Sequence, residues 1–246
     1  MAPLVYVCVR PQADAAEAEY ASFREATGLD QRGLERIDLT RDALPPDAFT
    51  RWRGFLVGGS PFNTTDLEDE KSSAQRRLEA DLVRIAHAAT ADPTTATATA
   101  ALFTCYGIGV ATRALGGEVT RDYAEDTGPA EIEVTAEGRD DALFGSLAPA
   151  FSALTAHKEA TARLPRGAVL LATSTTCPVQ AYRLGSRLYT TQFHPEPTTT
   201  AFTERMTVYR NHGYFDPEEY DIVAARVLAA SVTEPVRLLR AFAETF

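Results

Sequence analysis

Long apolar runs and a basic excess are both missing from this 246-residue sequence. The longest early apolar run, PLVYVCV, is too short to span a bilayer and lacks the layout of a signal peptide. The formal net charge is -10, and no Lys/Arg cluster offers a surface for nucleic-acid phosphates. These absences argue against a nucleic-acid partner and against a membrane protein.

Paired cysteines are also missing. Three cysteines, an odd number far apart, do not form a disulfide framework, and no CxxC occurs. Four scattered histidines offer no zinc-type spacing, so the sequence predicts no metal. Together with 45% apolar and 24% charged residues, this favours a soluble, reduced, cytoplasmic protein.

The first half of the chain alternates between short β-branched runs and helical stretches. The expected strands are 4–9, 34–40, 53–63 and 101–105, and the expected helices are 14–28 and 68–89. This alternation predicts an α/β fold, a flavodoxin-like open and mostly parallel sheet with helices on both faces. No internal repeat or linker-like shift appears, so we expect a single domain over residues 1–246.

The second half has a different pattern. Short alternating runs at 131–136, 168–174, 179–185 and 187–193 indicate a small antiparallel or mixed extension of the sheet. A helical pattern returns from about residue 200 and ends in EPVRLLRAFAETF. The Thr/Ala-rich stretch 90–100 is expected to be a surface connection.

Cys105 lies where the apolar run ALFTC meets a helical, glycine-containing stretch. A free cysteine is commonly a buried packing residue, which is the plainer interpretation. A strand that turns at once into a helix also describes a nucleophile elbow, where the helix N-terminus favours a thiolate. The stretch GIGVAT resembles the start of a dinucleotide fingerprint, but Thr112 replaces the third glycine, which makes this a weak signal.

His194 and Glu196 stand in the stretch TTQFHPEPT. Pro195 favours an extended conformation for the residue before it, and residues two apart in an extended chain point the same way. A carboxylate beside an imidazole fixes its tautomer and stabilises the imidazolium. Cys105, His194 and Glu196 can therefore act as nucleophile, base and orienting carboxylate. The simpler interpretation is a histidine that caps a strand.

Taken together, FTCYGIG, QFHPE, VGGSPFN and RALGG resemble the triad-type class I glutamine amidotransferases. The likeness extends over roughly residues 53–196 and is closest to stand-alone members similar to the amidotransferase domain of GMP synthase. It implies that Cys105 attacks the glutamine side-chain amide, forms a γ-glutamyl thioester and releases ammonia, with His194 and Glu196 assisting. It also implies that the backbone N–H groups of Gly59 and Tyr106 form an oxyanion hole. No cofactor is implied.

The same resemblance places Gly58, Ser60 and Gly109 at the substrate. Gly109 stands where the family has a glutamine that helps to hold the amino-acid end of the substrate, and Phe103 stands where the elbow has a glycine. His157 and Glu159 neighbour the site in the family pattern, although a structural role is the first expectation for them.

Two alternatives remain open on sequence grounds. One is a hydrolase of γ-glutamyl amines or γ-glutamyl peptides with the same triad. The other is a binding or regulatory module with a degenerate site, which the glycine at position 109 suggests. The expected partners are a small-molecule substrate, glutamine or a γ-glutamyl compound, and possible transfer of ammonia to a separate synthase chain.

Overall fold

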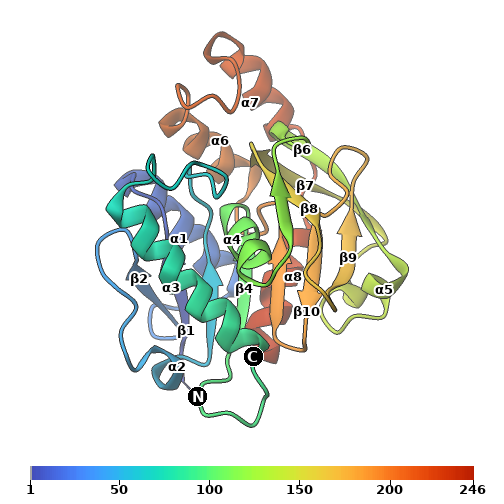
Figure 1. The fold of residues 1–246 in the computed structure, drawn as a ribbon. Coiled ribbons are helices and arrows are strands. Elements are labelled where there is room, and N and C mark those ends of the chain that lie inside the picture. The colour runs from blue at the N-terminus through green and yellow to red at the C-terminus, as the bar shows by residue number, and fades with distance from the viewer. Residues whose placement is uncertain (1) are drawn as a thin grey trace.

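A computed structural model describes residues 2–246, and its largest feature is a nine-stranded sheet (Figure 1). Its strands are β1 (Leu4–Cys8), β2 (Leu34–Asp38), β3 (Gly54–Val57), β4 (Ala100–Thr104), β6 (Glu125–Val134), β7 (Ala150–His157), β9 (Val169–Thr173), β10 (Ala181–Leu184) and β11 (Leu188–Thr191). They lie in the order β2-β1-β3-β4-β11-β10-β9-β6-β7.

The first five strands of that order are parallel, with β1 between β2 and β3 and β4 between β3 and β11. This is the 2-1-3-4-5 order of flavodoxin-like sheets, so the predicted fold class is confirmed. Both faces of β1 are buried, because Leu4, Tyr6 and Cys8 face one layer and Val5 and Val7 the other.

The remaining strands extend the sheet in antiparallel fashion. A separate two-stranded sheet pairs β5 (Glu118–Thr120) with β8 (Ala160–Arg163). The antiparallel extension was expected, but β5, β7 and β8 were not. The predicted strand 131–136 also starts late, because the first part of β6 contains Gly128 and Pro129, which usually indicate a turn.

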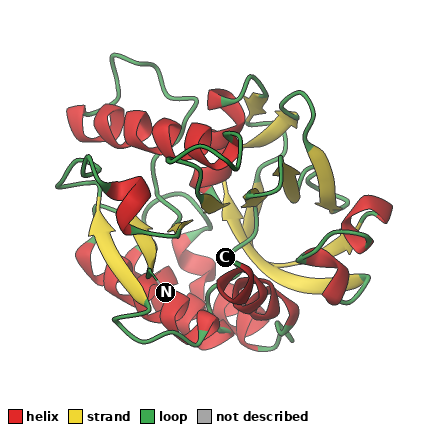
Figure 2. Ribbon diagram, turned by 90° about the horizontal axis from the view of Figure 1, so that it is seen from below, coloured by secondary structure: helices red, strands yellow, loops and turns green. Residues whose placement is uncertain are grey.

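Helices cover both faces of the sheet (Figure 2). They are α1 (Ala13–Thr27), α2 (Ala48–Arg51), α3 (Ser73–Thr90), α4 (Tyr106–Ala114), α5 (Ala136–Arg139), α6 (Thr199–Val208), α7 (Tyr220–Leu228) and α8 (Glu234–Thr245), with short 3-10 turns at Phe144–Ser146 and Pro217–Glu219. One core layer packs α1 and α8 on the sheet, and the other packs α3 and α4. In the part of the chain that the structure describes, no helix has the length and apolar character needed to cross a membrane.

Helices α6 and α7 lie at the top of the molecule beside β6 (Figure 1). The Thr198 side chain caps α6 by accepting a hydrogen bond from the N–H of Ala201 at 3.1 Å. Phe202 and Met206 of α6 pack with Val223 and Val227 of α7 in a small core of their own. The Thr/Ala-rich stretch is a largely exposed connection between α3 and β4, as the sequence predicted.

The turn between β4 and α4 consists of Cys105, with φ 51° and ψ -108°. Among residues 2–246 it is the one non-glycine residue with positive φ. A side chain in that region is strained, and such strain collects at functional sites. Gly107 permits the turn, because a Cβ there would lie 3.2 Å from the Cβ of Phe103. The Phe103 side chain is buried in the α3/α4 core layer, so the elbow forms with phenylalanine at this position.

This backbone conformation predicts an unusual order of stability for two substitutions. Cys105→Gly should be more stable than Cys105→Ala by about 1 kcal/mol, because glycine relieves the positive φ and outweighs its own entropic cost. Urea unfolding of both variants measures the difference. An alanine variant that is clearly the more stable of the two would contradict a strained turn.

Candidate active site

The ends of β4 and β11 bring the predicted nucleophile and base together. Thr104 of β4 pairs with Thr191 of β11, and the N–H of Cys105 donates to the carbonyl of Thr191 at 2.9 Å. Three residues later, the N–H of His194 donates to the carbonyl of Leu154 in β7 at 2.8 Å. Cys105 and His194 consequently line one cavity at the carboxyl edge of the parallel strands.

His194 and Glu196 form a buried pair, as the spacing predicted. The His194 Nδ1 donates to Glu196 Oε1 at 2.9 Å, because a carboxylate can only accept. Burial alone would lower the pKa of His194, but the charges of Glu196 and of Cys105 outweigh it and raise that pKa to about 9. Burial opposes ionisation of Glu196 too, yet His194 and Arg205 bring its pKa down to about 2. The arrangement favours a charged imidazolium beside the thiol.

Two arginines and a second glutamate continue this pair into the interior, and sequence reasoning did not find them. Arg205 Nη1 lies 2.9 Å from Glu196 Oε1 and 3.2 Å from Glu19 Oε1. Arg10 Nη2 lies 2.7 Å from the same Glu19 oxygen, and the Tyr6 hydroxyl donates to Glu19 Oε2 at 2.6 Å. A usable signal existed: Glu19 stands among Ala16, Tyr20 and Phe23, on the apolar stripe of its helix.

The Gly58-Gly59-Ser60 turn follows β3 and lies directly against these groups. A Cβ on Gly59 would lie 2.8 Å from Arg10 Nη2 and 2.9 Å from His194 Cε1, so only glycine fits. A Cβ on Gly58 would meet the Glu19 carboxylate. Ser60 lines the cavity, and its hydroxyl donates to the carbonyl of Val9 at 2.7 Å.

The expected oxyanion role of Gly59 does not match the orientation of its peptide group. Its N–H donates to Glu19 Oε1 at 3.2 Å, because the buried carboxylate lies closer than any oxyanion at Cys105 would. Tyr106 fits its expected role better. It begins α4, where the first N–H groups have no partner inside the helix, and its side chain points away to hydrogen-bond Glu79 at 2.7 Å.

A second hollow opens from Cys105 on the side of Gly109. There the Glu159 carboxylate accepts hydrogen bonds from the N–H groups of Thr64 at 2.6 Å and Thr65 at 3.0 Å. A Cβ on Gly109 would lie 3.2 Å from Thr64 and 3.4 Å from Glu159 Oε1. The space that a longer side chain at position 109 would occupy is therefore next to a buried carboxylate.

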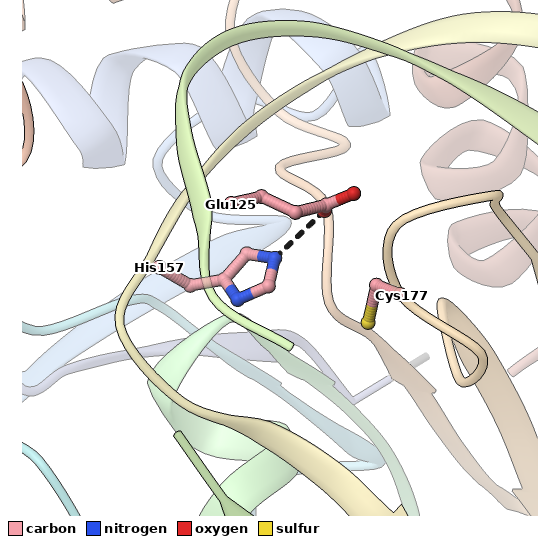
Figure 3. Close-up of side chains that lie close together, drawn as sticks. All are labelled: Glu125, His157 and Cys177. Atoms are coloured by element: carbon pink, nitrogen blue, oxygen red, sulfur yellow. Dashed lines mark hydrogen bonds and ion pairs between the residues drawn. The ribbon is translucent and has the colours of Figure 1, made fainter. Parts of the chain in front are cut away.

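His157 belongs to a different cluster, with Glu125 and Cys177 (Figure 3). His157 Nε2 lies 2.8 Å from Glu125 Oε2, and Gln180 and Thr176 also donate to that carboxylate. The three residues are of metal-ligand type and lie close together, which the sequence did not predict. Because the Glu125 oxygens are taken by these donors, the cluster is arranged as a hydrogen-bond network that fixes the end of β7.

Comparison with known proteins places the chain in a family. Residues 87–214 match the family "Glutamine amidotransferase class-I", and the chain belongs to it. A 98-residue stretch is 36% identical to the glutamine-hydrolyzing GMP synthase of Aeropyrum pernix, covering 40% of this chain and 19% of that protein. A 104-residue stretch is 35% identical to the glutamine-hydrolyzing GMP synthase of Aquifex aeolicus, covering 42% of this chain and 20% of that protein. The matched part thus spans about a fifth of these two relatives.

A shorter relative is covered more fully. A 93-residue stretch is 37% identical to one of the glutamine-hydrolyzing GMP synthase subunits from Methanothermobacter thermautotrophicus, covering 37% of this chain and 48% of that protein. The chain therefore resembles a relative that is itself one part of a larger GMP synthase.

The fold has solved counterparts over its whole length. A glutamine amidotransferase from Thermotoga maritima superimposes with a TM-score of 0.71 at 19% identity, covering 100% of this chain and 98% of that one. This likeness confirms the fold, including helices on both sides of a mostly parallel sheet.

The three cysteines are expected to differ in reactivity. Burial raises the pKa of Cys8, and burial with the charge of Glu125 raises the pKa of Cys177 to about 12. Cys105 is the one of the three that lines the cavity at a helix N-terminus. Brief iodoacetamide treatment at neutral pH, followed by peptide mass spectrometry, should label Cys105 first. Labelling led by Cys177 would contradict the nucleophile assignment.

The raised pKa of His194 predicts a specific pH dependence of stability. The folded protein holds this proton up to pH about 9, whereas the unfolded chain releases it near 6.5. The stabilisation is therefore complete below pH 6.5 and is lost as the pH rises through 9, a loss of about 3 kcal/mol. The difference in unfolding free energy between pH 6 and pH 9.5 (roughly the ends of this window) should shrink in His194→Asn. An equal difference in both proteins would refute the pKa assignment.

Proposed function

We propose that this chain is a thiol-dependent amidohydrolase that cleaves the side-chain amide of glutamine or of a γ-glutamyl compound. The observation that supports it most is the position of Cys105 on a strained turn, in one cavity with His194, whose other ring nitrogen contacts Glu196. Membership of the glutamine amidotransferase family supports the same chemistry. We take residues 1–246 as one amidotransferase-like domain.

The proposed reaction proceeds in two halves. The Cys105 thiolate attacks the γ-carbonyl carbon, a C–S bond forms, and the carbonyl electrons move to oxygen. The C–N bond then breaks, and the amine leaves with a proton from the His194 imidazolium. Water next gives its proton to the neutral His194 as its oxygen attacks the thioester carbon. The C–S bond breaks, and glutamate and the thiolate are regenerated.

The surrounding residues support defined roles in these steps. Glu196 holds His194 through Nδ1, which leaves Nε2 for the proton transfers. The Tyr106 N–H, at the start of α4, is placed to stabilise the oxyanion. For Gly59 to donate as well, the peptide between Gly58 and Gly59 has to turn its N–H away from Glu19 when substrate binds.

The amino-acid end of the substrate fits the hollow beside Gly109. Glu159 supplies a negative charge there, close to where an α-ammonium group would lie. An opposite charge in a partly buried site favours binding of a cation. Glu159 thus offers an alternative to the glutamine side chain that position 109 lacks. A separate synthase chain that accepts the ammonia remains a prediction, suggested by relatives named as GMP synthases.

Substitutions in the triad test the proposal. His194→Ala should abolish ammonia release, because no other group takes and returns the proton. Glu196→Gln should retain residual turnover, since an orienting group contributes less than the base itself. Ammonia release from glutamine and from a panel of γ-glutamyl amides measures both. His87→Ala, an exposed histidine on α3, is the matched control. Near-wild-type turnover in a folded His194→Ala protein would refute the triad.

A further inference from the structure

The cavity at Cys105 has two sides of different character. One side, of about 300 Å³, is lined by Gly109, Glu159 and other polar groups and suits an amino-acid end. The other side holds His194 and extends under α6 and the loop that follows it. We call this second side the α6 chamber; its large side chains are Phe202, Met206, Tyr209, Tyr214 and Phe215.

The chemistry determines which part of the substrate faces the α6 chamber. In the proposed reaction His194 protonates the leaving nitrogen, so that nitrogen must lie on the His194 side of Cys105. His194 lines the α6 chamber and not the hollow beside Gly109. Any substituent on the leaving nitrogen therefore extends into the chamber. Ammonia carries no substituent and would leave this apolar space without a ligand group.

The size and charge of the α6 chamber narrow the substituent further. Its volume is about 410 Å³, within the range of small-molecule sites. Its charged lining groups, Arg10 and Arg205, are cationic and are already paired with Glu19. A second ammonium on the leaving group would face these guanidinium groups at short range, which is unfavourable. An uncharged aromatic or alkyl group meets apolar surface instead.

Resting on the proposed function, we propose that the enzyme prefers γ-glutamyl amides of uncharged arylalkyl or alkyl amines over glutamine. Phe215 and Met206 are the specificity-determining residues, since both line the α6 chamber without contributing to the charge network. Phe215 is only partly buried, so its substitution leaves the fold intact more readily than a core change would. Tyr220 packs beside it, with ring centroids 6.1 Å apart.

Three amides test this preference: glutamine, γ-glutamyl benzylamide, and the same benzylamide carrying an aminomethyl group on its ring. We expect kcat/KM for the benzylamide to exceed that for glutamine by about tenfold or more, and the ring ammonium to remove the advantage. Phe215→Ala should lower the benzylamide-to-glutamine ratio about tenfold through lost contact. Met206→Trp should lower it by filling the chamber. Ile222→Ala, an exposed change on α7, should leave the ratio unchanged.

The outcomes separate the two proposals. Cys105-dependent hydrolysis of glutamine with no advantage for the benzylamide would overturn the preference and leave the proposed function intact. A preference for the cationic benzylamide would overturn it as well. No hydrolysis of any of the three amides by the folded wild-type protein would refute both proposals. Thermal unfolding of each variant identifies any that fails to fold, and the remaining one of Phe215→Ala and Met206→Trp then decides.

Discussion

Four buried charged side chains, Arg10, Glu19, Glu196 and Arg205, balance one another behind the candidate site, and each is at most 6% exposed. Arg205 contacts both carboxylates, so it joins α6 to α1 and to the residue that contacts His194. Removing one partner would leave an uncompensated buried charge, at a cost of about 3–5 kcal/mol. The same contacts set the charge beside the imidazole. The packing of α6 and the proton affinity of His194 therefore depend on a single network.

This network also explains the glycines that follow β3. Glu19 occupies the space where a Cβ on Gly58 would lie, and it accepts the N–H of Gly59. The turn is thus held in an orientation suited to the resting protein. Because Arg205 comes from α6, and α6 lines the cavity beside His194, a ligand in the α6 chamber would lie against the network that holds this turn. Substrate recognition and the geometry of the turn are consequently linked through shared residues.

Sequence reasoning located the parts of the site that depend on local signals. The strand-to-helix turn at Cys105 and the His-Pro-Glu stretch each have a recognisable pattern, and parallel strands that end at one edge bring them together. The parallel half of the sheet was predictable for the same reason, since its strands are buried on both faces. Glu19 and Arg205 escaped prediction because their roles exist only after α1 and α6 pack. Strand β7, with small residues and weak alternation, acquires its strand character from its pairing with β6.

Acylation of Cys105 is the step on which the proposed chemistry most directly depends. Wild-type protein mixed with substrate can be quenched in acid during turnover, digested and examined by peptide mass spectrometry. The proposal predicts an added γ-glutamyl group on the peptide that contains Cys105, and none on the peptides of Cys8 and Cys177. Release of amine without any γ-glutamyl group on Cys105, under conditions in which a chemically prepared thioester survives the quench, would contradict it.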